Sequence, residues 1–154
     1  MREIPADEVL VIDAATDTVI RRIPLAAGLH LAHVVLTPDS ASAYVTAQNE
    51  STVYKINARS YEVEGKVVAP SSSQPHGLRI SPEGSRAYIA LLQGNALGVL
   101  NLQTRVLDVV PLNGAAVQAA VTPDGRMALV SLYDTKILLI YPNTAKASTQ
   151  SWLP

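Results

Sequence analysis

The sequence contains no cysteine. This absence excludes disulfide bonds, thiolate zinc sites, iron–sulfur clusters and cysteine nucleophiles. Charged residues make up only 16% of the chain, against about 25% in a typical globular domain. So little charge argues against an acidic or basic disordered tail. The 154 residues, 48% of them hydrophobic, are enough for one domain with a buried core.

The sequence also lacks a long hydrophobic run and a strong charge of either sign. No apolar stretch approaches the ~18 residues of a membrane-spanning helix, and no signal-peptide core follows residues 1–5. The formal net charge of −1 gives no electrostatic footprint for nucleic acid or for an anionic membrane surface. We therefore expect no nucleic-acid partner and no membrane span.

An internal repeat is the main feature that is present. Three prolines each follow Ser or Thr and precede an acidic residue, and they stand 44 and 41 residues apart. Six residues after each proline comes a Tyr or Leu inside an apolar stretch. The prolines are Pro38, Pro82 and Pro123, and the residues that follow them at this spacing are Tyr44, Tyr88 and Leu129.

Each repeat predicts four short β-strands rich in Val, Ile, Leu and Tyr and bounded by turn-forming residues. The chain then divides into a leading hairpin at 8–25 and three four-stranded units at about 31–69, 75–112 and 116–153. No window shows the apolar spacing and caps of a helix. Successive expected strands are 9–12, 19–23, 34–36, 43–47, 52–56, 63–68, 78–80, 87–91, 96–100, 106–110, 119–121, 127–132, 136–141 and 149–153.

The turns between these strands have physical explanations. In the turns at 81–84 and 122–125, proline presets φ and glycine supplies a positive φ. The matching turn at 37–40 has Ser40 in place of that glycine, so we expect it to be more strained or differently closed. A second turn in each repeat begins with Asp13, Asn57 or Asn101, whose side chains can accept hydrogen bonds from the turn's own N–H groups.

Four strands in each unit of about 40–45 residues are typical of a β-propeller blade. A single blade cannot bury both of its faces, so each blade needs a neighbour on either side. The expected fold is therefore all-β, a partial β-propeller of four-stranded antiparallel blades.

The motifs resemble the YVTN-type β-propeller repeat. In that repeat a proline-containing loop leads into a strand, a Ser-Pro-Asp-Gly turn, a strand with Tyr-Val, and later a strand ending Val-Ile-Asp before a turn with Thr. The resemblance covers nearly the whole chain and implies the propeller fold. It rests on Pro-His-Gly at 75–77, Ser-Pro-Glu-Gly at 81–84, Tyr-Ile-Ala at 88–90, Thr-Pro-Asp at 37–39, Tyr-Val-Thr at 44–46 and Val-Ile-Asp at 11–13, while Leu-Val-Ser at 129–131 departs from it.

The resemblance implies no single activity. YVTN-type repeats occur in surface-layer and cell-envelope proteins, lactonase-like enzymes, amine dehydrogenase heavy chains and haem-binding propellers of nitrite reductases. It favours a periplasmic or cell-envelope location. An activity taken from that range would rest on fold analogy alone.

The number of blades is unusual. Propellers have four to eight blades, whereas this sequence predicts three complete blades and one leading hairpin. The end blades would expose apolar faces and open strand edges, which favour association. We expect either a homo-oligomer, most simply a dimer, or one part of a longer propeller.

The three histidines are candidate ligand-binding residues. His30, His33 and His76 lie in segments that lead into a first strand, on the expected channel face. Three imidazoles can bind zinc or copper, and one can bind a haem iron. The alternative is that each is an ordinary imidazole bonded to backbone. Aligned on the prolines, His33, Gly77 and Gln118 share one position, so the histidines do not repeat at one site.

Arg79 is the fourth candidate binding residue, because it stands mid-strand where the other copies carry Val35 and Ala120. A guanidinium there can hold a carboxylate or phosphate with two hydrogen bonds. Its alternatives are pairing with Glu83 or reaching to solvent. The acidic residues of the proline turns are explained by the turns themselves.

Two functions remain open from the sequence. We expect a non-catalytic binding or scaffold module whose channel face, with His30, His33, His76 and Arg79, holds a protein, peptide or small molecule. The alternative is half of a metal- or haem-bearing or lactonase-like periplasmic propeller enzyme with the three histidines near the channel. No motif specifies a cofactor, a metal site or a catalytic residue, and we expect none.

Overall fold

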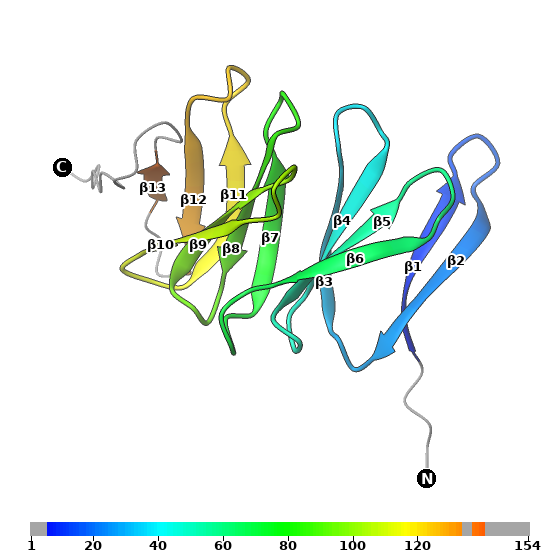
Figure 1. Ribbon diagram of the computed structural model, residues 1–154, viewed down its shortest axis with the longest axis horizontal. Helices are drawn as coiled ribbons and strands as arrows, with labels where there is room; N and C mark the ends of the chain where they lie inside the picture. The colour runs from blue at the N-terminus through cyan, green and yellow to red at the C-terminus, as the bar shows by residue number, and fades with distance from the viewer. Residues whose placement is uncertain (1–5, 134–136, 141–154) are drawn as a thin grey trace, which may run out of the picture.

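The computed structural model describes residues 6–133 and 137–140, which form β-strands joined by turns and loops (Figure 1). Within this part of the chain there is no helix able to cross a membrane. The strands are β1 (Ala6–Asp13), β2 (Thr18–Ala27), β3 (Leu31–Leu36), β4 (Ser42–Ala47), β5 (Thr52–Asn57), β6 (Val63–Val68), β7 (Pro75–Ile80), β8 (Arg86–Leu91), β9 (Ala96–Asn101), β10 (Leu107–Pro111), β11 (Ala116–Val121), β12 (Ala128–Leu132) and β13 (Ile137–Ile140).

The strands form four antiparallel sheets in which each strand pairs with its neighbours in sequence. The first sheet is β1–β2, followed by β3 to β6 (blade 1), β7 to β10 (blade 2) and β11 to β13 (blade 3). Figure 1 shows these sheets side by side in chain order. The expected last strand at 149–153 lies outside the described residues. The chain is an all-β partial propeller, as the sequence predicts.

The middle strands of blades 1 and 2 are largely buried on both faces, because each of these sheets lies between two others. In β8, the side chains of Tyr88, Ile89, Ala90 and Leu91 are all at most 1% exposed. A strand in this position needs a continuous apolar run rather than alternation. The outer strand β6 instead alternates between exposed and half-buried residues. A continuous apolar run therefore indicates a middle strand of a blade, and an interrupted run indicates an outer strand.

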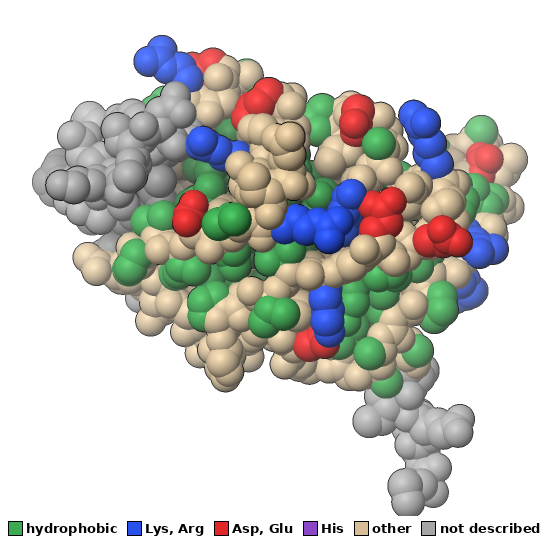
Figure 2. Space-filling view, viewed as in Figure 1, with side chains coloured by type: hydrophobic (Ala, Val, Ile, Leu, Met, Phe, Trp, Pro, Cys, Tyr) green, Lys and Arg blue, Asp and Glu red, His purple; other side chains and the backbone are tan. Residues whose placement is uncertain are grey.

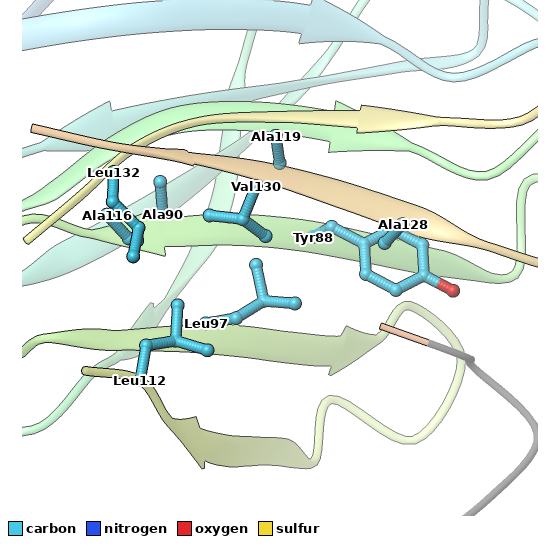
Figure 3. Packing of buried hydrophobic residues seen from close by; sticks show 9 residues of the cluster. All are labelled: Tyr88, Ala90, Leu97, Leu112, Ala116, Ala119, Ala128, Val130 and Leu132. Atoms are coloured by element: carbon cyan, nitrogen blue, oxygen red, sulfur yellow. The ribbon is translucent and has the colours of Figure 1, made fainter. Parts of the chain in front are cut away.

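Three hydrophobic clusters fill the spaces between neighbouring sheets. Between blades 2 and 3, β8 and β9 contribute apolar side chains that face those of β11 and β12 (Figure 3). A second cluster joins blades 1 and 2, with Tyr44 and Val53 against Leu78 and Ile89. The third joins the β1–β2 sheet to blade 1. Each blade therefore depends on its neighbour for burial of its apolar face.

The proline turns form as the sequence predicts. In all three, the fourth residue donates its N–H to the carbonyl of the first at 2.8 Å. Gly84 and Gly125 have φ values of 74° and 69°, and Ser40 adopts a φ of 56° at the same position. Ser40 therefore occupies a left-handed conformation that glycine adopts more easily.

The second set of turns is closed by side-chain caps. Asp13 Oδ1 accepts hydrogen bonds from the N–H groups of Ala15 and Thr16 at 2.8 and 3.0 Å. Those two donors lower the pKa of Asp13 below its ordinary value. Asn57 and Asn101 close their turns with the same pair of bonds.

The first strands of the three blades, β3, β7 and β11, lie next to one another and are called the innermost strands. β7 is in contact with both β3 and β11, and all three strands share an irregularity of register near their start. Gly77 lies at this irregularity. A Cβ atom there would stand 2.5 Å from the carbonyl oxygen of Val117 and 2.6 Å from Cα of Gln118. Gly77 therefore allows the backbones of β7 and β11 to approach closely.

Exchanging the residues of two equivalent turns should change stability in opposite directions. We expect Ser40→Gly to stabilise the protein by about 0.5 kcal/mol and Gly84→Ser to destabilise it by about 1 kcal/mol, because only glycine tolerates this φ without strain. A Cβ atom at Gly84 meets its nearest neighbour at an ordinary 3.4 Å. Urea unfolding measures both effects. A Gly84→Ser variant as stable as the wild type would contradict the strain argument.

Adding one methyl group at Gly77 should separate blades 2 and 3. We expect Gly77→Ala to cost about 3 kcal/mol of unfolding free energy. Besides the movable Oε1 of Gln118 at 2.1 Å, backbone atoms of Val117 and Gln118 lie within 2.6 Å of the new Cβ and cannot move aside alone. Gly98→Ala is the matched control, since its new Cβ meets the flexible Cδ1 of Leu107 at 3.1 Å. Calorimetry should show a much smaller effect for Gly98→Ala, and equal losses would refute the explanation.

Candidate binding face on the innermost strands

The structure brings two of the three histidines together. His33 on β3 and His76 on β7 have ring centroids 5.2 Å apart, with the ring planes inclined at 60°. Both lie within the first strand of their blade, although the sequence pattern placed them in the preceding loops. Each of these strands continues past its register irregularity toward its N-terminal end. Because the added part has no continuous apolar run, the sequence pattern did not predict it. The pair therefore sits on a sheet rather than on flexible loops.

A buried threonine holds the two histidine backbones in place. The N–H of His33 donates to Oγ1 of Thr46 at 3.0 Å, and this hydroxyl lies 2.9 Å from the carbonyl oxygen of His76, to which it donates. Thr46 is fully buried on β4. Because one hydroxyl bonds two strands of different blades, it fixes the spacing of the imidazoles. Thr46 is not among the residues predicted from the sequence, where its only signal is a polar residue inside an otherwise apolar strand.

The hydrogen bond of His76 determines which nitrogen carries its proton. Nδ1 of His76 lies 2.9 Å from the carbonyl oxygen of Val117 on β11. A carbonyl oxygen only accepts, so Nδ1 donates to it. The neutral ring then keeps Nε2 as an acceptor. His76 thereby connects blade 2 to blade 3.

Arg79 contributes positive charge to the same face. It lies on β7 and is exposed, and its Nη1 donates to the carbonyl oxygen of Leu78 at 2.8 Å. This bond differs from the pairing with Glu83 that the sequence left open. Glu83 instead accepts from the hydroxyl of Ser85 at 2.7 Å, which lowers its pKa. The guanidinium is therefore anchored at one nitrogen beside the His33–His76 pair.

The pKa of His33 reports this environment. Partial burial lowers it below its ordinary value, and the nearby charges of His76 and Arg79 lower it further. Both charged groups that act on His33 are thus cationic when protonated.

His30 does not join the pair. It precedes β3, is exposed, and has a left-handed φ of 55°. Its N–H points to Oδ2 of Asp7 at 3.3 Å, and Leu29 donates to the same oxygen at 2.5 Å. Among the residues that the structure describes, no three His, Asp or Glu side chains lie together as they would around a metal ion. Of the four candidate residues, the structure therefore groups His33, His76 and Arg79.

Charges elsewhere on the surface are mixed in sign. Figure 2 shows Lys and Arg side chains interspersed with Asp and Glu on one face. On blade 1, Lys55 lies 2.7 Å from Glu64, and Lys66 bonds Glu50. These pairs join β5 and β6 or an adjacent loop, so they neutralise charge on the outer strands. On the first strands of blades 1 and 2, by contrast, His33, His76 and Arg79 lie near one another.

No family model matches the chain, and no match appears among curated proteins. Solved structures do match. Hydrazine synthase of Kuenenia stuttgartiensis has a TM-score of 0.71 at 19% identity, over 79% of this chain and 37% of that protein. A protein of unknown function from Desulfotomaculum acetoxidans has a TM-score of 0.76 at 16% identity, over 94% of this chain and 47% of its own.

A 6-phosphogluconolactonase candidate from Bacteroides fragilis is also similar, with a TM-score of 0.70 at 18% identity over 85% of this chain and 40% of that one. The chain thus spans less than half the length of each of these structures. At such identities the likeness shows the fold alone. The neighbours have propeller-type folds, which agrees with the arrangement of blades, and membership of the YVTN-type family stays a prediction. The fold of this chain is therefore that of a partial β-propeller.

Proposed function

We propose that this chain is a non-catalytic binding module that holds an anionic group, such as a carboxylate of a peptide or small molecule, on its innermost strands. The observation that carries the proposal is the His33–His76 pair, 5.2 Å apart, with the Arg79 cation acting on His33. These groups come from two blades and are held by backbone and by Thr46. A rigid support of this kind suits recognition.

The chemistry of Arg79 and His33 favours an oxyanion. Arg79 uses one nitrogen for the Leu78 carbonyl, which leaves other guanidinium N–H groups for a carboxylate or phosphate. Protonated His33 would add a donor and a positive charge. Binding of an anion and protonation of His33 therefore support each other, because each reduces the cost of the other.

An enzyme remains a second candidate function, because one structural neighbour is a lactonase candidate. In that case the chain would be half of a metal- or haem-bearing or lactonase-like propeller. His33 and His76 would supply two ligands to a metal, and a third would have to come from outside the described residues. Zinc binding that disappears in the double variant His33→Gln, His76→Gln would favour this function over the first.

We also propose that the chain acts within a larger assembly, either as a homo-oligomer such as a dimer or with the rest of a longer propeller. Support comes from the open β1–β2 sheet, which has two strands where blades 1 and 2 have four. Apolar side chains are also exposed at this end of the molecule. Light scattering tests the oligomer, and a mass equal to one chain would exclude it.

Anion binding should depend on Arg79. We expect Arg79→Ala to weaken binding of succinate and inorganic phosphate at least fivefold, because the guanidinium supplies the permanent charge. Arg59→Ala is the matched control, since this exposed arginine lies in the turn between β5 and β6. Titration calorimetry and imidazole NMR shifts measure the effect. If neither anion shifts the His33 and His76 signals, or if both variants bind like the wild type, the proposal is wrong.

Acidification should destabilise the protein through His33. Its pKa is lowered in the folded state, so the unfolded chain binds a proton more readily. The contribution to stability is complete above the unfolded pKa of about 6.5 and is lost as the pH falls through the lower folded value. Melting temperatures between pH 7 and 5 should fall less in His33→Gln than in the wild type. In Arg79→Ala, the NMR titration midpoint of His33 should move upward, and an unchanged midpoint would argue against the assigned cause.

A further inference from the structure

The β1–β2 sheet leaves an apolar hollow beside blade 1. The hollow has a volume of about 450 Å³ and lies between β1 and the inner strands of blade 1. Its lining is apolar except for Ser40 and Tyr61. The other lining residues are Val9, Leu10, Val11, Ile12, Ile23, Val34, Leu36, Ala43, Ile56 and Ala58. In Figure 1, β1 and β2 stand at the N-terminal end of the row of sheets, with no sheet beyond them.

A comparison between the repeats shows which side chain of β1 is left uncovered. Ile12, Ile56 and Leu100 each precede the Asp or Asn that caps the turn after the third strand of a blade. Ile56 and Leu100 are 1% exposed, whereas Ile12 is 56% exposed. Ile56 and Leu100 each have a second strand of their own blade beside them, and each packs in the cluster that joins its blade to the sheet before it. Ile12 has neither, because β1 pairs only with β2 and no sheet of the described residues precedes it.

The first strand of blade 1 also carries a side chain that is exposed, although its equivalents in blades 2 and 3 are buried. Val34, Leu78 and Ala119 each stand four residues before the proline of their turn. Leu78 and Ala119 are 0% and 1% exposed, whereas Val34 is 55% exposed. Leu78 and Ala119 pack in the clusters that join each blade to the one before it. The uncovered surface therefore matches the first and second strands of a preceding blade.

The register of the missing strands follows from the complete blades. In each, an alanine of the second strand pairs with the third-strand residue equivalent to Ile12. The pairs are Ala43 with Ile56 in blade 1 and Ala87 with Leu100 in blade 2. A strand paired with β1 in the same way would place an alanine opposite Ile12.

We propose, building on the assembly proposed above, that β1 and the adjoining hollow receive a two-stranded β-hairpin that belongs to a longer propeller chain and supplies the first and second strands of this blade. The hairpin runs antiparallel to β1, carries alanine opposite Ile12, and covers Val34 and Leu36 with uncharged side chains. The surface continues the interface already repeated between blades 1, 2 and 3.

The occupant is a segment of a longer propeller chain rather than a second copy of this one. All three hairpins of this type in the described residues, β3–β4, β7–β8 and β11–β12, are already paired with their own third strands. A second copy therefore has no described hairpin free to donate. The matching solved propellers are more than twice as long as the part that this chain covers. Chains of that length contain further segments that can supply such a hairpin.

A peptide made from this chain's own second blade tests the proposal. A synthetic peptide of residues 74–92 contains β7 and β8, and its Ala87 would pair with Ile12. We expect a saturating concentration of this peptide to slow hydrogen exchange at least tenfold. The amides measured are those on the edge of β1 that does not pair with β2. The same peptide with Tyr88→Pro cannot continue the strand pairing and serves as the control. Absence of protection, or equal protection by the control peptide, would overturn the proposal.

Substitutions in the protein locate the binding surface. Ile12→Lys should weaken peptide binding at least tenfold while leaving the fold intact, because Ile12 is already 56% exposed. Ile20→Lys is the matched control: Ile20 is 54% exposed on β2 and lies outside the hollow. Equal binding by both variants would overturn the proposal. So would a light-scattering mass of two chains together with β1 amides that are protected before any peptide is added.

Discussion

The structure depends on the burial of sheet faces by neighbouring sheets. A blade of this chain has apolar side chains on both faces of its middle strands, and in β8 these are at most 1% exposed. Burial of such side chains contributes roughly 1.5–3 kcal/mol each, so a blade with one bare face loses a large share of its stability. The hydrophobic clusters alternate with the sheets along the row. Every other feature, including the pair of imidazoles, is positioned by this stacking.

The sequence predicted the fold well because its signals are local. Proline turns and side-chain caps depend on residues within four positions of one another, and the observed bonds at Asp13, Asn57 and Asn101 are those expected. The strain at Ser40 was likewise visible from a missing glycine, and its φ of 56° confirms the prediction. The repeat then assigned similar segments to similar places without any knowledge of tertiary contacts.

The candidate site was predicted only in part, because contacts between blades join residues about forty positions apart. Sequence alone grouped His30 with the other two histidines, yet the turn before β3 holds it away in a left-handed conformation. It also gave no reason to connect His33 and His76 through Thr46, since the hydroxyl acts across two sheets. Only the packing of β3 against β7 brings these groups together.

One position of the repeat explains how blades with similar backbones can form a binding face with different side chains. His33, Gly77 and Gln118 occupy the same place in their blades. Gly77 must be small because the backbone of β11 lies against it, and His76, one residue earlier, bonds that same strand through Val117. In blade 1 the position instead holds the imidazole that meets His76. The repeat sets the backbone conformation at this position in every blade. The side chain at the position then determines whether it is used for packing or for recognition.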